Sequence, residues 1–142
     1  MTTTSATPTL DGQFLSRQAD ALRRERQVQS DLAAALLEEI RILNDDTAMS
    51  DSTADDGFGE GTGSAVDQDR DRALHAQAKA RVEEIDAALQ RIETGSYGRC
   101  EVCGDAIGEA RLEALPTATQ CVACKAGGLA SRHRAGAGRY AA

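Results

Sequence analysis

Apolar residues recur at alternating steps of four and three between about Asp11 and about Leu43. This spacing aligns the side chains in a single stripe along an α-helix, as in a coiled coil. The apolar positions of the stripe are Leu15, Ala19, Leu22, Ala33, Leu36, Ile40 and Leu43. Two polar residues, Arg26 and Gln29, interrupt it. The pattern therefore predicts a long helix with looser packing near its middle.

A second stripe runs from about Ala65 to about Thr94. Its positions are Asp71, His75, Ala78, Val82, Ile85, Leu89 and Ile92, with Leu74 beside them. Carboxylates gather where this segment starts, which suits the positive end of a helix dipole. We therefore expect a second helix, with His75 as a packing or interface residue and not a metal ligand.

The segment between the two stripes, residues 44–64, has a different composition. It holds six carboxylates, four glycines and no basic residue. Glycine is costly to order in a helix, so the segment is predicted to be a flexible acidic loop. Two helices of ~45–50 Å joined by one loop favour an antiparallel coiled-coil hairpin with an acidic tip. Two helices of a larger oligomeric bundle are the alternative.

Composition limits what else the chain can build. Aromatic residues number only four (Phe14, Phe58, Tyr97 and Tyr140), so a thick globular core is not expected. The net charge of -7 argues against a primary role in binding DNA or RNA. The chain has no apolar run of ~20 residues and no leader-like N-terminus, so a cytoplasmic protein is expected.

All four cysteines of the chain form one pattern, C-x2-C-x17-C-x2-C. Each C-x2-C turn presents two thiolates, and two such turns complete the tetrahedral shell of one Zn2+. Cys100, Cys103, Cys121 and Cys124 are therefore the predicted ligands of a structural zinc ion. A pair of disulfides or four free thiols are the alternatives.

These elements predict a mainly α fold, a long antiparallel coiled-coil helical hairpin followed by a small C-terminal four-cysteine zinc finger. The predicted parts are a disordered tail (1–10), the hairpin (11–94), the finger (95–130) and a basic tail (131–142). The finger follows the second helix directly, so we expect it at the base of the hairpin, opposite the acidic loop. The arginines of the basic tail, Arg132, Arg134 and Arg139, are interpreted as a solvated end that offsets acidic surface.

The zinc-finger region resembles a known family. Tyr97-Gly-Arg-Cys-Glu-Val-Cys-Gly104, Ile107-Gly108, Arg111-Leu-Glu-Ala-Leu-Pro-Thr-Ala118 and Cys121-Val-Ala-Cys-Lys125 closely resemble the zinc-finger signature of the DksA/TraR family. Many zinc ribbons share a cysteine quartet, but the R-L-E-A-x-P-T-A run is specific. The resemblance covers roughly residues 95–130, and the preceding hairpin matches the layout of the family.

The resemblance implies a bacterial transcription regulator that binds RNA polymerase directly rather than DNA. The sequence itself contains no Ser/His/Asp or paired-carboxylate arrangement and no phosphate-binding loop, so an enzyme is not expected. In this family the coiled coil enters the secondary channel of the polymerase, and its acidic tip approaches the catalytic Mg2+. Some members act together with ppGpp. The resemblance places Asp51, Asp55 and Asp56 at that tip; the alternative is that they are solvated acids that keep the loop disordered. The Asp-x-x-Asp-x-Ala motif of the best-studied member is absent from residues 44–74.

Three other functions are compatible with parts of the sequence. Tip carboxylates could hold a second Mg2+ and promote transcript cleavage, as Gre-like factors do, although Gly57, Gly59, Gly61 and Gly63 argue against a rigid site. A zinc ribbon could bind nucleic acid through the basic tail, but no stacking aromatic cluster accompanies it. Oxidation of the thiols could release zinc in a redox response.

Overall fold

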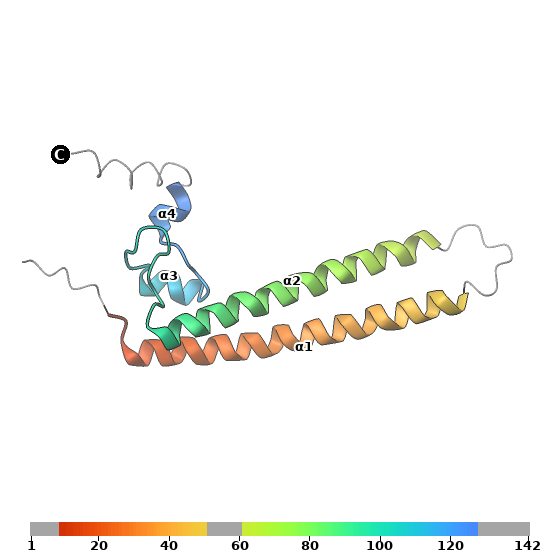
Figure 1. Cartoon of the computed structure of the whole chain (residues 1–142), viewed down its shortest axis with the longest axis horizontal. Helices are drawn as coiled ribbons and strands as arrows, with labels where there is room; N and C mark the ends of the chain where they lie inside the picture. The colour runs from red at the N-terminus through yellow and green to blue at the C-terminus, as the bar shows by residue number, and fades with distance from the viewer. Residues whose placement is uncertain (1–8, 51–60, 128–142) are drawn as a thin grey trace, which may run out of the picture. The chain divides into compact units, whose positions relative to one another are not determined.

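The computed structural model describes residues 9–50 and 61–127. These residues form four helices, α1 (Gly12–Ser50), α2 (Gly61–Thr94), α3 (Glu109–Ala114) and α4 (Val122–Gly127) (Figure 1). The predicted mainly α fold, with two long helices followed by a small cysteine-containing region, is confirmed. None of the helices in the described ranges is long and apolar enough to span a membrane.

The chain divides into two compact units. One consists of Arg23–Asp86, which is the larger part of both long helices. The other combines the chain up to Leu22 with the chain from Ala87 onward. A boundary between hairpin and finger was predicted at residues 94 and 95. That boundary stays a prediction. The second compact unit contains the N-terminal end of α1 and the C-terminal end of α2 together with the finger residues, with which they share an apolar core.

In the unit Arg23–Asp86, α1 and α2 lie side by side and run in opposite directions (Figure 1). Burial follows the predicted stripes, since the buried apolar residues here are Ala33, Leu36, Ile40, Ala78 and Ile85. Many of the buried residues are small or aliphatic, so the two helices enclose only a thin core. The alternating pattern of the sequence therefore identified the packed face of each helix.

The polar stripe residue Arg26 pairs with a partner on the other helix, so it does not simply interrupt the packing. Its guanidinium donates to both carboxylate oxygens of Asp86. Nearby, Arg81 Nε donates to Glu25 Oε1 at 2.8 Å, and Arg81 Nη1 donates to Glu84 Oε2 at 3.0 Å. The hydrogen bond to Glu25 raises the pKa of Arg81 above its ordinary value. These charged pairs connect α1 to α2 and favour one register of the hairpin.

The predicted loop of residues 44–64 is longer than the structure allows. Helix α1 continues to Ser50 and α2 begins at Gly61. Residues 44–50 contain neither glycine nor proline, and extending an existing helix costs far less than nucleating a new one. Residue propensity alone is a weak guide in that situation, which is why the loop prediction was wrong at both ends. Residues 51–60 lie outside the described part of the chain.

The other unit has its own apolar core. Its deeply buried side chains come from α1, from α2 and from the segment after α2. They are Phe14, Ala19, Leu22, Ala88, Tyr97, Ile107, Leu112 and Ala118. The N-terminal end of α1 and the C-terminal end of α2 therefore pack in one core with the segment that carries the cysteines. This core supports the cysteine-containing loops.

Candidate metal centre

The first cysteine pair lies in a tight turn. The backbone N–H of Gly104 donates to the carbonyl of Cys100 at 2.9 Å. Gly104 has a φ of 79°, a left-handed conformation that glycine adopts without a steric penalty. The turn therefore holds Cys100 and Cys103 on the same side of the backbone, as a zinc knuckle requires.

An antiparallel bridge between Arg99 and Ala106 closes this knuckle at its base. The N–H of Cys100 donates to the carbonyl of Asp105, and the N–H of Ile107 donates to the carbonyl of Gly98, both at 2.8 Å. These bonds satisfy the backbone on both sides of the turn. The bridge fixes the direction in which the Cys100 thiol points.

The second cysteine pair lies at the start of α4. Lys125 N–H donates to the carbonyl of Cys121 at 2.9 Å, which closes the second turn. Two further bonds tie the segment before Cys121 to the rest of the finger. Glu101 N–H donates to the carbonyl of Thr119 at 2.9 Å, and Arg111 Nε donates to the carbonyl of Gln120 at 3.0 Å. The two knuckles are therefore held face to face.

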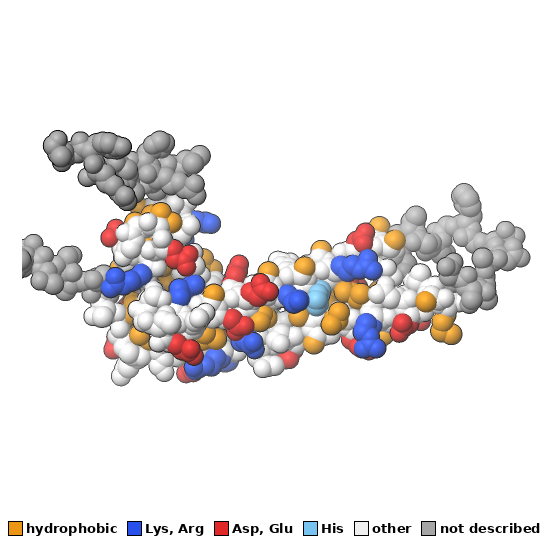
Figure 2. All heavy atoms as spheres, in the orientation of Figure 1, with side chains coloured by type: hydrophobic (Ala, Val, Ile, Leu, Met, Phe, Trp, Pro, Cys, Tyr) orange, Lys and Arg blue, Asp and Glu red, His pale blue; other side chains and the backbone are white. Residues whose placement is uncertain are grey.

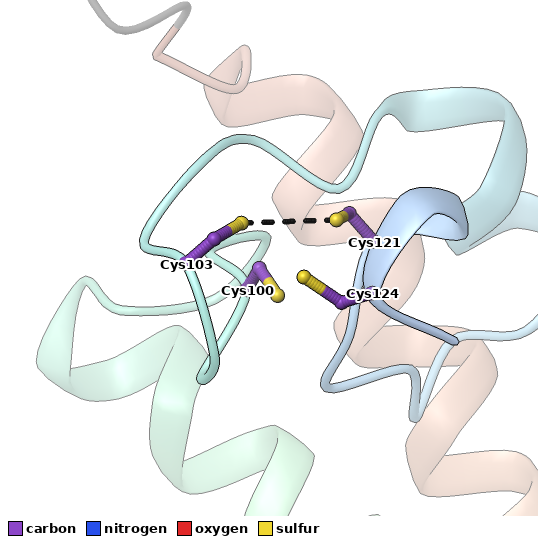
Figure 3. A group of neighbouring side chains, drawn as sticks. All are labelled: Cys100, Cys103, Cys121 and Cys124. Atoms are coloured by element: carbon purple, nitrogen blue, oxygen red, sulfur yellow. Dashed lines mark hydrogen bonds between the residues drawn. The ribbon is translucent and has the colours of Figure 1, made fainter. Parts of the chain in front are cut away.

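The four thiols converge on one point (Figure 3). All four Sγ atoms lie within 4.8 Å of one another, and the Sγ atoms of Cys103 and Cys121 are 3.7 Å apart. Four sulfurs at ~2.3 Å from a tetrahedral zinc ion are separated by ~3.8 Å. The arrangement therefore fits one Zn2+ with four protein ligands.

The local electrostatics are compatible with a cation bound by thiolates. Burial raises the pKa of the Cys100 thiol, but backbone hydrogen bonds, chiefly from Cys103 and Cys121, outweigh burial and lower the pKa to about 6. The pKa of Cys124 is instead raised, mainly by its hydrogen bond with the Cys121 thiol. Four thiolates this close repel one another unless a divalent ion compensates their charge. Four sulfur ligands also leave no open position for a substrate or water, so the site is structural.

The R-L-E-A-L-P-T-A run has a structural explanation. Leu112 of α3 is completely buried, and Ala118 is also in the core. The carbonyl of Pro116 accepts a 2.7 Å hydrogen bond from the Tyr97 hydroxyl, while burial raises the pKa of Tyr97 to about 12. Arg111 reaches the second knuckle, as described above. The run therefore packs the finger and positions its knuckles.

Arg91 is a residue whose role the sequence did not reveal. Its carbonyl accepts hydrogen bonds from the N–H groups of Ser96 and Tyr97, at 3.0 and 3.1 Å. Its Nη1 lies 3.8 Å from Glu101 Oε1, beside the first knuckle. A basic residue in the last helical turn was the available signal. Arg91 thus links the end of α2 to the zinc knuckle.

Substituting Gly98 with alanine is expected to destabilise this unit by about 1–3 kcal/mol. Gly98 has a φ of 84°, and an added Cβ would lie 2.5 Å from Leu10 Cδ1. Thermal or denaturant unfolding of the zinc-loaded chain measures the loss. Gly104→Ala is the matched control, because its φ is 79° but nothing lies within 4 Å of the added Cβ. Equal losses in the two variants would contradict a role for the close packing.

The other site residues can now be placed. His75 is half-buried on α2, which fits the predicted packing position, and the described residues contain no second cluster of potential metal ligands. Asp51, Asp55 and Asp56 lie outside the described part of the chain. So do His133 and the three arginines of the basic tail.

Comparison with known proteins gives the same picture of the finger. Residues 95–127 match the family model described as the prokaryotic dksA/traR C4-type zinc finger. The RNA polymerase-binding transcription factor DksA of Caulobacter vibrioides is 54% identical over 56 residues, which are 37% of this chain and 39% of that protein. The DksA of Haemophilus influenzae is 41% identical over 58 residues, 41% of this chain and 35% of that protein. The matched sequence thus spans about two fifths of these relatives or less.

The likeness in structure extends further along the chain. The transcription factor DksA2 from Pseudomonas aeruginosa matches with a TM-score of 0.69 and 27% sequence identity, over 87% of this chain and 88% of that one. Together, the C4-type finger and the clustered thiols show that the chain carries one structural Zn2+.

Proposed function

We propose that this chain, a DksA-like protein with one structural Zn2+, is a regulator that binds bacterial RNA polymerase and modulates transcription initiation. The structural match to DksA2 over most of the chain is the observation that carries the proposal. It covers the hairpin as well as the finger, whereas the sequence matches to proteins named as polymerase-binding factors cover about two fifths of the chain. The proposed place of action is the bacterial cytoplasm.

The role of each part follows from its chemistry. Cys100, Cys103, Cys121 and Cys124 are the proposed zinc ligands, and the metal stabilises the finger without taking part in a reaction. The hairpin is the proposed probe that enters the secondary channel of the polymerase. It is acidic, and its part Arg23–Asp86 has only a thin core between two helices, which suits insertion into a positively lined channel. We assign no enzymatic step to this chain itself.

The proposed contact with the polymerase active site is made by the residues between α1 and α2. Asp51, Asp55 and Asp56 would supply the negative charge there, close to the catalytic Mg2+. Their carboxylates would act on the stability of the open complex by electrostatic interaction, with ppGpp as the proposed co-regulator. Because the Asp-x-x-Asp-x-Ala motif is absent, the size and sign of the effect are expected to be particular to this chain.

A competition experiment tests the proposal. The zinc-loaded chain is expected to bind core RNA polymerase and to displace a fluorescent secondary-channel factor, with an affinity that falls as salt rises. Binding to a promoter duplex without polymerase is expected to be undetectable at physiological salt, since the chain is strongly acidic. Failure to displace the channel factor, or tight binding to free duplex, would refute the proposal.

The triple variant Asp51→Asn, Asp55→Asn, Asp56→Asn separates binding from regulation. It is expected to keep its affinity for core polymerase within a few fold while losing most of its effect on open-complex lifetime. A matched control neutralises Asp31, Glu38 and Glu39 with Asn and Gln, which removes the same charge from exposed positions on α1. An equal loss of activity in this control would mean that net charge, and not the tip, is responsible.

A further inference from the structure

The two ends of the unit Arg23–Asp86 are held together differently. Towards Arg26 and Asp86, buried apolar residues and charged pairs both connect the helices. Towards residues 51–60 the apolar packing becomes thinner: Leu43 and His75 are half-buried, and no described side chain is fully buried between Arg41 and Met49 or between Ala65 and Gln77. The space-filling view shows both polar and apolar side chains on the surface of this end of α1 and α2 (Figure 2). Hydrophobic burial therefore contributes less to the register of the helices at this end than near Arg26 and Asp86.

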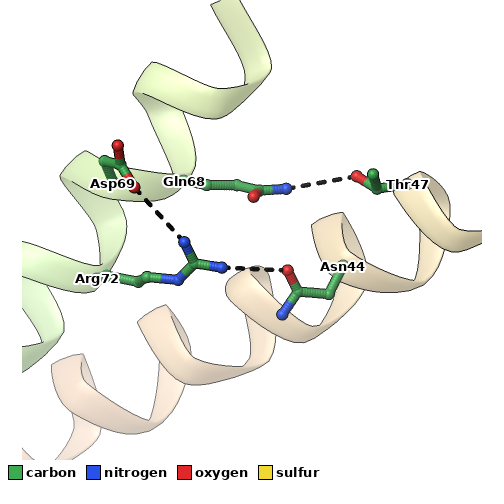
Figure 4. Close-up of polar contacts among 5 residues, drawn as sticks. All are labelled: Asn44, Thr47, Gln68, Asp69 and Arg72. Atoms are coloured by element: carbon green, nitrogen blue, oxygen red, sulfur yellow. Dashed lines mark hydrogen bonds and ion pairs between the residues drawn. The ribbon is translucent and has the colours of Figure 1, made fainter. Parts of the chain in front are cut away.

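At this end of the unit, polar side chains of α1 and α2 are hydrogen-bonded to one another (Figure 4). Arg72 Nη2 donates to Asn44 Oδ1 on α1 at 3.4 Å, and its Nη1 donates to Asp69 Oδ1 on α2 at 3.5 Å. Gln68 Nε2 donates to Thr47 Oγ1 at 3.5 Å. These bonds are long and exposed, so they add little to global stability. They are, however, specific for one alignment of α1 with α2.

We propose that Arg72 is a positioning residue, which fixes the register of α1 against α2 at the end of the hairpin beside residues 51–60. The planar guanidinium has several donors in a fixed geometry, so one side chain can hold an acceptor on its own helix and another on the facing helix. Asp69 on α2 orients the guanidinium of Arg72, and Asn44 on α1 accepts a hydrogen bond from it. The helical turns Asn44–Ser50, which were predicted to be loop, are thereby kept against α2.

The consequence for regulation rests on the proposed function. If the hairpin acts through the residues between Ser50 and Gly61, the register of α1 and α2 sets the separation of the two points from which those residues start. Arg72 then controls how strongly the bound chain alters the stability of the open complex. The affinity for RNA polymerase is set by the finger and by the part of the hairpin around Arg26 and Asp86. Loss of Arg72 should reduce the maximal effect and leave the affinity unchanged.

The variant Arg72→Ala tests this, with Arg70→Ala as the matched control. Both variants remove one positive charge from exposed positions two residues apart on α2, and only Arg72 is joined to Asn44 of α1 by the hydrogen bond drawn in Figure 4. In the full zinc-loaded chain, Arg72→Ala is expected to speed amide hydrogen exchange in residues 44–50 by about two- to five-fold. Arg70→Ala should leave it unchanged. The Asn44→Ala, Arg72→Ala double variant should exchange no faster than either single variant.

Transcription assays provide the second readout. With core polymerase and a promoter, Arg72→Ala is expected to reduce the maximal effect on open-complex lifetime by at least half. The concentration that gives half of the maximal effect should stay within two-fold of that of the native chain. Equal exchange in Arg72→Ala and Arg70→Ala would overturn the positioning role, and so would an unchanged maximal effect. A parallel fall of affinity and melting temperature would also overturn it, since that result indicates a purely structural role.

The two readouts distinguish this inference from the proposed function. If the native chain does not bind polymerase at all, the proposed function fails and the regulatory role of Arg72 fails with it. Faster exchange confined to Arg72→Ala would in that case still support Arg72 as the residue that sets the helix register.

Discussion

Cys100→Ser is expected to reduce bound zinc from one ion per chain to nearly none and to unfold residues 95–127. Zinc binding supplies on the order of 10 kcal/mol in small metal-stabilised folds, which is more than a finger of this size can replace by packing. Cys100 is the most buried of the four cysteines, with 3% of its surface exposed, so the substitution removes the ligand that is best shielded from solvent. Zinc analysis of the purified chain and hydrogen exchange of the finger measure both effects.

Val102→Ser is the control for this substitution. Val102 lies within the same knuckle, is 46% exposed and offers no metal ligand. It should therefore keep one zinc ion and a protected finger. The long helices of the unit Arg23–Asp86 have their own packed residues, and they are expected to retain most of their circular dichroism signal in Cys100→Ser. A Cys100→Ser chain with full zinc content and a protected finger would disprove the structural role of the metal.

Phe14→Ala is expected to destabilise the unit that contains the finger by about 3–5 kcal/mol. Among the residues that the structure describes, Phe14 is the largest with less than 2% of its surface exposed; its value is 1%. It belongs to α1 but shares its compact unit with the finger. Truncation leaves a cavity in this small core, and typical domains have only about 5–15 kcal/mol of stability in total. Denaturant unfolding of the zinc-loaded chain measures the change.

Hydrogen exchange shows where the loss of stability occurs. In Phe14→Ala, amides in residues 87–127 should lose protection together with the start of α1, while residues 30–40 and 78–85 should change much less. Val28→Ala is the control, because Val28 lies on the same helix but is 62% exposed. Loss of protection confined to the start of α1 would contradict a shared core between that helix and the finger.

Local sequence patterns predicted the features that depend on local chemistry. The stripe residues Leu22, Leu36, Ile40 and Ile85 are buried because their spacing matches the helical period and one apolar face was available to each helix. The four cysteines converge because C-x2-C turns have few possible geometries. The four ligands of the metal site could therefore be predicted from the sequence.

Features that depend on contacts between distant segments could not be predicted in this way. The sequence does not show which polar side chains pair with one another after folding. The pairs Arg26–Asp86 and Arg72–Asn44 depend on the register of α1 against α2. The pair Arg91–Glu101 depends on how the chain turns after α2. The extent of the helices was also misjudged. Most of residues 44–50 are polar and have modest helix propensity, yet they continue an established helix.

The sequence by itself determined the fold class, the packed face of each long helix and the ligands proposed for zinc. These properties follow from hydrophobic period and from the coordination chemistry of thiolates, which act over a few residues or turns. The tertiary structure decided how the chain is divided, which polar residues cross between the helices and where the helices end. Those properties depend on which side chains come into contact after folding. Phe14 of α1 is buried in the apolar core of the unit that contains the finger. Arg72 of α2 is hydrogen-bonded to Asn44 of α1 at the end of the other unit that precedes residues 51–60.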